Sequence, residues 1–554
     1  MIFISYKHRQ PQGTVPTSCE PINLKNIHHK ITLESCRDNA PVLVRCLTLI
    51  VHINYYAIII NKYKNNIDIK FHKRVGMIGR EKEIAILEET LSSNRAEMVA
   101  VYGRRRIGKT YLVEQFYKKS NIKTISLIGQ SGATMQTQLD NAKHRLFEQH
   151  GIEVSKAKNW TDIFNAIKLY HQEHPRKHFV LFIDELPWIA TPKSGFIGAL
   201  SYSWNSYFEE YSNVTFVLCG SAASWMIKKV VNDKGGLHQR LTRQIPLYPF
   251  SLKESEEYLK QQGFHYLSRK EIIDIYIVLG GVAQYLSFLN PQKSISENIN
   301  QLCFTIGGEL TREFQTLFMA LFGKKGVHQQ VVKYLGSVKK RLFLVEEIAK
   351  KFDMKVEQLY ITLDELEMAG FITKYTMYGR KKRDARYSLT DPFSAFYLKW
   401  ISPTTQQDLL ENENYWQFIV GSQNWISWAG NSFESVCHKH ILPIKKALGI
   451  SGVHTQTYYW QELGTENKKG TEIDMLIQRA DKTVMVIEIK YYNQPFTISK
   501  SYAENLKHKI ESFREKDKKN NSLMLVMLTT YGVKKNSYSN MINKEIIMDI
   551  LFEG

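Results

Sequence analysis

The segment from Val99 to Tyr117, VAVYGRRRIGKTYLVEQFY, constrains the fold of this chain more than any other. Its short apolar run predicts a buried strand, and the residues from Lys109 onward have the pattern of a helix. The turn between them matches G-x-x-x-x-G-K-[ST]. Glycines in such a turn allow backbone N–H groups to point inward at phosphates, and a helix start favours negative charge. The segment therefore predicts a phosphate-binding loop between a strand and a helix.

The residue types in this loop predict the nucleotide and its metal ion. Lys109 would reach the β and γ phosphates of ATP, and the Thr110 hydroxyl would hold Mg²⁺. The residues that we predict to bind the nucleotide here are Gly103, Arg104, Arg105, Arg106, Ile107, Gly108, Lys109, Thr110 and Tyr111.

Two later strands predict the remaining parts of this site. HFVLFIDELPWI (178–189) is a buried strand that ends in Asp184 and Glu185. Asp184 would orient the shell of the Mg²⁺ ion, and Glu185 would position or deprotonate the attacking water. VTFVLCGS (214–221) ends in Ser221, which is placed to sense the γ-phosphate. Strands that alternate with helical patterns predict an α/β fold with a parallel sheet covered on both faces.

Five segments, taken in order, resemble the DExx-box P-loop ATPases common in archaea, which are relatives of the AAA+ and signal-transducing NTPases. The segments are IGRE (78–81), YGRRRIGKT (102–110), LFIDE (181–185), LCGS (218–221) and HQRLTRQIPLYPFS (238–251). The resemblance covers most of residues 77–400. It implies that Ile78, Gly79 and Arg80 lie near the adenine. It also makes Arg240 and Arg243 candidates for a charge-stabilising catalytic arginine, with Arg240 preferred; the alternative for both is ordinary surface charge.

Residues 345–391 have the pattern of a winged helix. Helices are predicted at 345–352 and 356–370, followed by a β-hairpin. Because the second helix carries four acids and no Lys or Arg, it is unsuited to reading bases in a major groove. The hairpin is basic and is predicted to contact nucleic-acid phosphates without reading sequence. The basic residues of this predicted wing are Arg380, Lys381, Lys382, Arg383 and Arg386. The alternative is a winged helix that serves only to pack.

A second group of charges occurs near the C-terminus, in GTEIDMLIQRADKTVMVIEIKYY (470–492). Alternation along the strand TVMVIEIK places Glu488 and Lys490 on one face. In a hairpin, Asp474 would meet Glu488, and two adjacent carboxylates repel unless a cation lies between them. A hard ion such as Mg²⁺ is the natural bridge, with Lys490 orienting water or neutralising charge.

This pattern resembles the PD-(D/E)xK nuclease superfamily over residues 425–530. Glu434, in the helical GNSFESV, matches the acidic helix residue of that superfamily and would join Asp474 and Glu488 as a metal ligand. Three alternatives remain open: an active nuclease, a nuclease-like fold kept as a binding module, or an unrelated sheet.

Together the patterns predict five parts, in an α/β protein: an N-terminal extension (1–76), a P-loop ATPase core (77–250), a helical lid (251–326), a winged helix (327–400) and a nuclease-like domain (401–554). The apolar stretch at 42–60 contains Arg45, which disfavours a membrane span. Six cysteines without paired spacing favour a reduced, cytoplasmic compartment.

The charge of the chain bears on its partners. A formal net charge of +20 favours nucleic acid, bound mainly through nonspecific phosphate contacts. The leading hypothesis is an ATPase that acts on nucleic acid, with a C-terminal nuclease as a further activity. Its rival is a nucleotide-driven regulatory switch whose nuclease-like domain only binds; a membrane-anchored ATPase is the third and weakest. The sequence is compatible with a homo-oligomer but does not determine the oligomeric state.

Overall fold

The computed structural model describes residues 77–553, apart from 176, 233–236, 238, 324–325, 338–339, 382–383, 463 and 465–469. The N-terminal stretch 1–76, with its apolar segment at 42–60, lies outside the described residues. Within the described part of the chain, no helix is long and apolar enough to cross a membrane.

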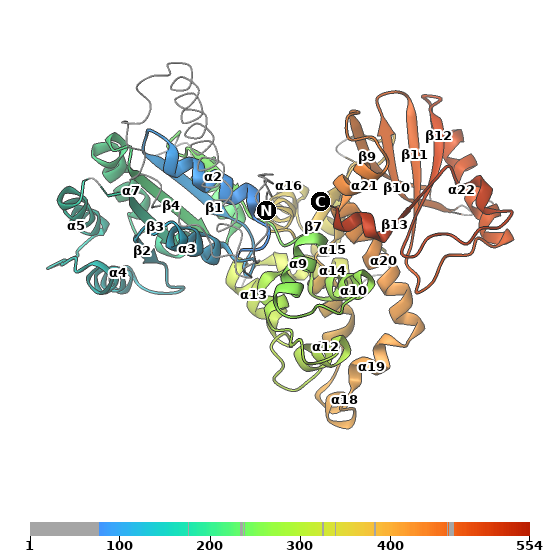
Figure 1. The fold of residues 1–554 in the computed structure, drawn as a ribbon, viewed down its shortest axis with the longest axis horizontal. Helices are drawn as coiled ribbons and strands as arrows, with labels where there is room; N and C mark the ends of the chain where they lie inside the picture. The colour runs from blue at the N-terminus through green and yellow to red at the C-terminus, as the bar shows by residue number, and fades with distance from the viewer. Residues whose placement is uncertain are drawn as a thin grey trace, which may run out of the picture. The chain divides into compact units, whose positions relative to one another are not determined.

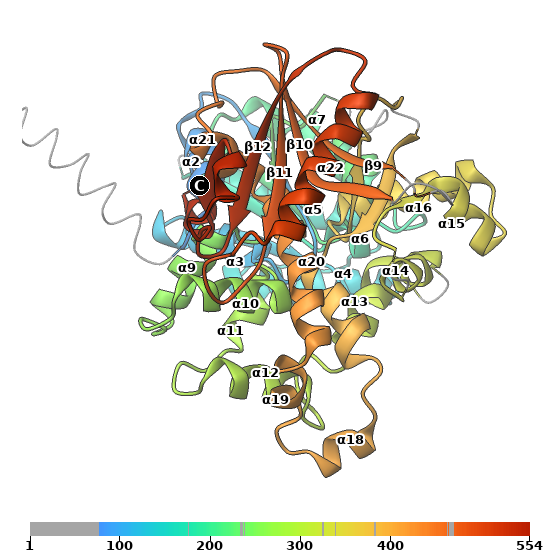
Figure 2. The same cartoon turned by 90° about the vertical axis from the view of Figure 1, so that its right-hand side faces the viewer.

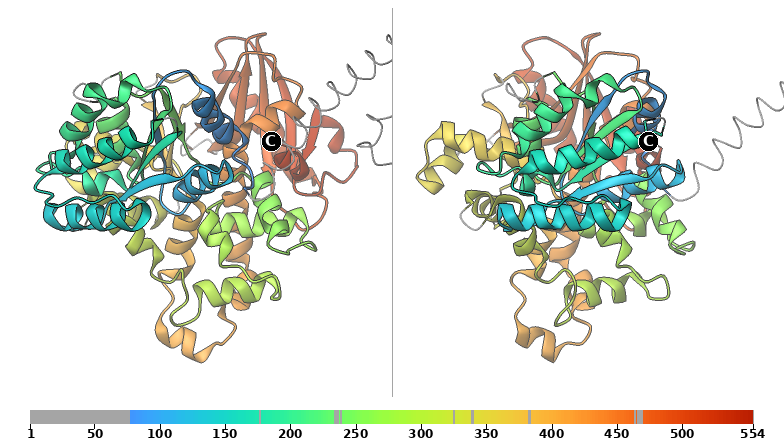
Figure 3. Two further views of the ribbon diagram at one scale, coloured as in Figure 1. Left: turned by 60° about the vertical axis from the view of Figure 1, so that its left-hand side comes forward. Right: turned by 90° about the vertical axis from the view of Figure 1, so that its left-hand side faces the viewer.

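The first part of the chain forms a parallel five-stranded sheet in the order β2-β3-β4-β1-β5 (Figures 1 and 3). Its strands are β1 (Glu97–Tyr102), β2 (Thr124–Ile128), β3 (Phe179–Asp184), β4 (Val214–Gly220) and β5 (Arg243–Pro246). The strands β3 and β4 are buried on both faces, as their continuous apolar runs predict. The predicted α/β fold with a parallel sheet is confirmed.

Alternation along the strands assigns the helices to the two faces of this sheet. Val99 and Val101 pack against α2 and α3, whereas Met98 and Ala100 face the core under α4, α5 and α7. The helices are α2 (Glu81–Ser92), α3 (Lys109–Lys119), α4 (Met135–His150), α5 (Trp160–Glu173), α6 (Leu186–Ile189), α7 (Phe196–Ser206) and α8 (Ala223–Met226). Because all strands run the same way, the residues that follow β1, β3 and β4 meet at one edge.

A helical segment follows the first sheet. It consists of α9 (Leu252–Gln261), α10 (Arg269–Leu279), α11 (Ala283–Ser287), α12 (Ile295–Cys303) and α13 (Glu313–Phe322). Three of these helices, α9, α10 and α12, start with capping boxes in which a serine hydroxyl and a glutamate satisfy the first free N–H groups. Gly281 allows the close approach of Phe250, because a Cβ at this glycine would lie 1.9 Å from the Phe250 carbonyl oxygen.

The next segment contains the helices and hairpin that the sequence predicts. Its elements are α14 (Val327–Ser337), β6 (Phe343–Leu344), α15 (Val345–Phe352), α16 (Val356–Met368), β7 (Ile372–Tyr375), β8 (Arg386–Leu389) and α17 (Pro392–Phe396). The three strands form a small antiparallel sheet in the order β6-β8-β7.

The C-terminal part is built on a mixed sheet in the order β13-β12-β11-β10-β9 (Figure 2). Here β9, β10 and β11 are antiparallel neighbours, and β11, β12 and β13 are parallel. The strands are β9 (Thr455–Glu462), β10 (Thr471–Arg479), β11 (Thr483–Lys490), β12 (Ser522–Thr529) and β13 (Lys544–Ile547). The helices are α18 (Gln406–Glu411), α19 (Tyr415–Val420), α20 (Gln423–Lys439), α21 (Ile441–Ala447) and α22 (Lys500–Lys516).

The alternation predicted for β11 is confirmed. Val484 and Val486 pack under α22, while Met485, Ile487 and Ile489 face α20 and α21. The second of these cores continues through the lid helices and the segment 327–401, so that one hydrophobic core runs from Phe250 to Phe552, beside the separate core under α22. We call residues 250–553 the C-terminal body. The first sheet has two cores of its own, so polar contacts carry much of its attachment to this body.

Candidate functional site

The phosphate-binding loop lies between β1 and α3, as its sequence predicts. Gly103 (φ 153°) and Gly108 (φ 90°) adopt backbone conformations that favour glycine. The Lys109 ammonium donates a hydrogen bond of 2.8 Å to the carbonyl of Arg104. Burial lowers the pKa of Lys109, so this lysine is held in a desolvated position where a phosphate would be its natural partner.

The predicted acidic residues lie at the same edge of the sheet. The Thr110 hydroxyl donates to the Asp184 carboxylate at 2.7 Å. A hydroxyl beside a carboxylate is a set of hard oxygen ligands suited to Mg²⁺. The Ser221 hydroxyl donates to the Glu185 carboxylate at 2.8 Å, and Glu185 has a left-handed backbone (φ 48°). The structure therefore brings together all four polar residues predicted from β3, β4 and the loop.

Two arginines of the loop leave the phosphate site and contact the C-terminal body. Arg104 is buried and forms an ion pair with Asp391, which caps α17. Arg106 pairs with Glu313 of α13 at 2.7 Å. The Arg106 carbonyl also accepts a hydrogen bond of 3.1 Å from the backbone N–H of Gln284 in the lid. The sequence predicted these arginines as nucleotide ligands; the side chains of both are instead committed to carboxylates of the body.

Arg105 of the loop and Arg80, which precedes α2, do not pair with the described carboxylates of the C-terminal body. The Arg105 guanidinium lies over the ring of Trp188, 5.4 Å from its centre. Arg80 is buried, and it donates to the carbonyls of Tyr248 (2.9 Å) and Ile107 (3.4 Å). Arg80 thus ties the phosphate-binding loop to the segment that enters the body.

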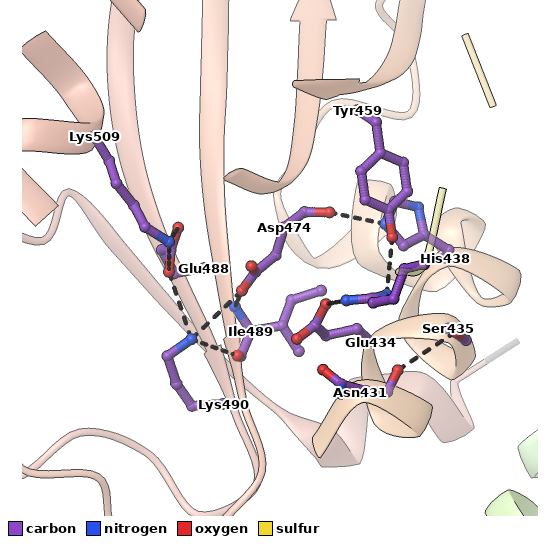
Figure 4. Close-up of polar contacts among 11 residues, drawn as sticks. Asn431, Glu434, Ser435, His438, Tyr459, Asp474, Glu488, Ile489, Lys490 and Lys509 are labelled. Atoms are coloured by element: carbon purple, nitrogen blue, oxygen red, sulfur yellow. Dashed lines mark hydrogen bonds and ion pairs between the residues drawn. The ribbon is translucent and has the colours of Figure 1, made fainter. Parts of the chain in front are cut away.

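A second polar cluster forms at the ends of β10 and β11 (Figure 4). Asp474 accepts a hydrogen bond of 2.8 Å from the backbone N–H of Ile489, and its own carbonyl accepts one of 2.9 Å from His438. These contacts replace the regular ladder where β10 has a register shift. The Lys490 ammonium lies 3.5 Å from both Asp474 and Glu488. The predicted meeting of these three residues is thus present.

Lys509 of α22 was missed by sequence reasoning and is the main partner of Glu488. Its ammonium lies 2.7 Å and 2.9 Å from the two oxygens of the fully buried Glu488 carboxylate. Tyr502 donates to the same carboxylate at 3.1 Å. In the sequence, Lys509 is one of several lysines on a polar helix, and its spacing does not single it out. Its contact with Glu488 could be anticipated only by placing α22 over the face of β11 that carries Glu488.

Glu434 does not complete a metal site with the other two carboxylates. Glu434 forms an ion pair with Arg341. The Arg341 guanidinium also donates a hydrogen bond of 3.1 Å to the Tyr459 hydroxyl. Burial raises the pKa of Glu434 to about 7, with a further contribution from Asp474 that Arg341 opposes. Glu434 stands on α20, which covers the face of the sheet opposite to α22. This correction follows from the position of that helix.

Three carboxylates of this cluster have cationic side chains as partners. Asp474 and Glu488 are matched by Lys490 and Lys509, and Glu434 is matched by Arg341. In the part of the chain that the structure describes, no group of three or more His, Cys, Asp or Glu residues is arranged to hold a metal. Repulsion between the carboxylates, which motivated the metal prediction, is relieved here by ammonium and guanidinium groups.

Comparison with known proteins identifies the first part of the chain. Residues 77–289 match a family described as an ATPase domain predominantly from Archaea. This chain contains an archaeal-type P-loop ATPase domain. The chain is similar over 53 residues to an uncharacterized ATP-binding protein, MJ0423 of Methanocaldococcus jannaschii (38% identical, covering 10% of this chain and 90% of that protein).

Two further similarities extend over more of the chain. The uncharacterized protein MJECL04 of Methanocaldococcus jannaschii is 22% identical over 423 residues, which are 75% of this chain and 87% of that protein. The Walker-type ATPase PABY2304 of Pyrococcus abyssi is 17% identical, with a TM-score of 0.43, over 59% of this chain and 97% of that one. Residues 429–543 match a domain of unknown function (DUF4143).

The preferred catalytic arginine of the ATPase domain is wrongly placed for its own nucleotide. In the parallel pairing of β5 with β1, Arg243 lies opposite Val99, at the end of the sheet away from the phosphate-binding loop. Arg240 precedes β5 and pairs with Glu209 at 3.1 Å, and Arg243 lies 3.6 Å from Glu89. Neither arginine reaches the phosphate-binding loop of the same chain. Both lie at or before the start of β5, whereas the loop follows the end of the parallel strand β1.

The predicted wing is partly occupied by contacts with the C-terminal sheet. The backbone N–H of Tyr378 donates to the Tyr459 carbonyl at 2.9 Å, and the Tyr378 hydroxyl donates to Asp517 at 2.9 Å. Arg380 and Lys381 are exposed, whereas Arg386 lies on β8 and is half-buried; Lys382 and Arg383 lie outside the described residues. The hairpin thus serves as a packing element as well as a basic surface.

The acidic helix α16 faces the ATPase domain. Glu365 bonds to Lys228 and to His328, each at 2.7 Å. The side chain of His328 and that of Lys228 hold the pKa of Glu365 at about 2. These contacts give helix α16 a structural role between two parts of the chain.

Proposed function

We propose that this protein is an ATP-hydrolysing switch that transmits the state of its nucleotide to the C-terminal body. One observation carries the proposal: the phosphate-binding loop itself is ion-paired to the body, through Arg104 with Asp391 and Arg106 with Glu313. A phosphate that draws Lys109 away from the Arg104 carbonyl would move the backbone that carries both arginines. Because one hydrophobic core joins the lid helices, the segment 327–401 and one face of the C-terminal sheet, such a movement would reach all three parts of the body.

The chemistry of hydrolysis rests on the four polar residues at the sheet edge. ATP would bind with Mg²⁺ held by Thr110 and Asp184, and the metal would neutralise charge on the phosphates. Glu185 would orient or deprotonate water once the Ser221 hydroxyl releases it. In the structure, this hydrogen bond keeps Glu185 directed at Ser221, which fits a resting state.

The C-terminal domain is proposed as a binding module for nucleic acid. Glu434, Asp474 and Glu488 already have Arg341, Lys490 and Lys509 as partners, and this pairing favours binding over metal-dependent cutting. The charge of +20 makes nucleic acid the favoured partner. A metal-dependent nuclease is the second candidate function, because Asp474, Glu488 and Lys490 gather at one point as that chemistry requires.

Two measurements test the switch. Lys109→Ala should abolish ATP turnover, and turnover that persists would reject the nucleotide site. Hydrogen exchange of the Glu185→Gln variant, which should bind ATP without hydrolysing it, is then compared with ADP and with ATP. We expect protection near α13 and α17 to depend on the nucleotide, and to lose this dependence in Arg106→Ala. Equal protection with ADP and ATP would contradict the proposal.

A third measurement separates the two roles of the C-terminal domain. Plasmid and single-stranded DNA are incubated with the protein and Mg²⁺ or Mn²⁺. We expect no cutting beyond that of a sample carrying Asp474→Ala and Lys490→Ala. Cutting by the wild-type protein that this double variant abolishes would establish the nuclease and overturn the binding-module assignment.

A further inference from the structure

A cleft of ≈ 520 Å³ lies within the C-terminal body, and its lining includes Arg341 and Asp391, which also contact the two sites described above. One wall comes from the end of α14 and the residues after it, a second from the end of β8 and α17, and a third from α20. Its volume lies within the range of clefts that bind small ligands, about 300–1,000 Å³. A short single-stranded segment can enter such a space, whereas a double helix cannot.

The cleft is positively charged. Four basic side chains line it, namely Lys340, Arg341, Lys399 and Lys439, against the single carboxylate of Asp391. That carboxylate is already committed to Arg104 and to the cap of α17. Lys340 and Arg341 have carboxylate partners on the cleft's margin.

Lys399 and Lys439 supply the excess charge. Both side chains are exposed, and in the described ranges no carboxylate lies within ion-pair distance of either ammonium. Lys399 lies 5.6 Å from the centre of the Trp400 ring. These two lysines thus bring two ammonium groups to one cleft, where they can hold successive anions.

The third wall adds neutral hydrogen-bonding groups in a regular row. Asn424, Ser427, Asn431 and Ser435 recur every three or four residues along α20 and line the cleft as one stripe. Amide and hydroxyl groups of this kind bond to phosphate and sugar oxygens without reading sequence. Trp428 belongs to the same lining and offers a flat ring on which a base can stack.

We propose that this cleft binds single-stranded nucleic acid, with Lys399 and Lys439 contacting phosphates and the polar stripe of α20 contacting the backbone. The inference rests on the proposed function for its partner class and names where that partner binds. The ion pair of Arg104 with Asp391 would then connect the two sites, because Asp391 lines the cleft and Arg104 belongs to the phosphate-binding loop.

The test measures binding of fluorescein-labelled fifteen-nucleotide dT and rU strands by anisotropy. It is done at pH 7.0, where exposed lysine ammonium groups are charged. Each phosphate contact on a single strand contributes about 0.7 to the slope of log K against log salt concentration. Removing two contacts with Lys399→Ala plus Lys439→Ala should lower that slope by about 1.4 and weaken binding about 25-fold at 0.1 M salt.

A matched variant controls for lost charge alone. Lys446→Ala plus Lys507→Ala removes two exposed lysines of the same domain that lie outside the cleft, and it should bind as the wild-type protein does. Equal losses in both double variants, or an unchanged slope in the cleft variant, would overturn the proposal. So would loss of binding in Arg380→Ala plus Lys381→Ala with none in the cleft variant, since the hairpin would then be the site.

The same samples separate this inference from the proposed function. ATP turnover and nucleotide-dependent protection of α13 are measured on the cleft variant. If these persist while binding of the strands is unaffected, the cleft assignment fails and the switch stands. If binding is weakened as expected but protection never depends on nucleotide, the cleft stands and the switch fails. A preference for rU over dT would identify RNA as the partner.

Discussion

Replacing Asp391 by serine tests how firmly the phosphate-binding loop is joined to the C-terminal body. Asp391 and Arg104 each have about 2% of their side chains exposed. Burial raises the pKa of Asp391, but the Arg104 guanidinium outweighs that effect and holds the pKa below its usual range. Serine caps a helix about as well as aspartate does, so Asp391→Ser keeps the start of α17 and removes only the charge.

The expected loss comes from the charge that is left behind. Arg104 would remain buried without its counter-ion, and its Nε and Nη2 atoms already have no hydrogen-bond partner. Removing one partner of a buried pair costs about 3–5 kcal/mol. Since 1 kcal/mol shifts the unfolding midpoint of a domain of 150–250 residues by about 2–4 °C, we expect the midpoint to fall by roughly 6–20 °C.

The assay is a thermal melt followed by circular dichroism, with two companion variants. Asp364→Ser changes an exposed aspartate of α16 and should leave the midpoint unchanged. Arg104→Met combined with Asp391→Ser removes both charges and should recover most of the stability that Asp391→Ser alone loses. If the double variant is as unstable as the sum of the two single changes, the ion pair is not what couples these residues, and the reasoning is refuted.

Two further predictions concern buried charges. Burial lowers the pKa of His440 to about 4, below the 6.5 of the unfolded chain, so stability from this group is complete above pH 6.5 and is lost as the pH falls toward 4. Between pH 7 and pH 5 the loss is about 2 kcal/mol. His440→Gln should remove it and the exposed His265→Gln should not, and melts at these two pH values compare them. Lys509→Met should cost about 3 kcal/mol at pH 8 by stranding Glu488. Because burial already raises the pKa of Glu488, this cost should shrink at pH 5, and a cost independent of pH would contradict the assignment.

Much of the ATPase site could be predicted from the sequence, because its residues lie close together along the chain or at the ends of neighbouring strands. The glycines, Lys109 and Thr110 lie within one turn, and β3 and β4 each end in the residues that complete the site. In a parallel sheet, such strand ends meet at one edge whatever the loops between them do. For the same reason, the alternation of TVMVIEIK was enough to assign Glu488 and Ile489 to opposite faces.

The charge partners could not be predicted in this way. Arg104 was predicted as a nucleotide ligand, yet its partner Asp391 lies 287 residues further along the chain. Glu434 was predicted as a metal ligand, yet Arg341 takes its carboxylate. Arg240 matched a catalytic pattern, but the direction in which β5 enters the sheet placed it at the wrong edge.

The sequence by itself therefore determined the strands, the phosphate-binding loop and the faces on which the charged residues stand. These follow from backbone conformation and from the repeat of apolar residues along each strand or helix, and both depend on only a few neighbouring residues. Only the tertiary structure decided which charges meet, because helices α20 and α22 approach the sheet from opposite faces and carry Glu434 and Lys509 to different sides. An ion pair depends on position in space, and its energy is the same whether two or three hundred residues separate the partners.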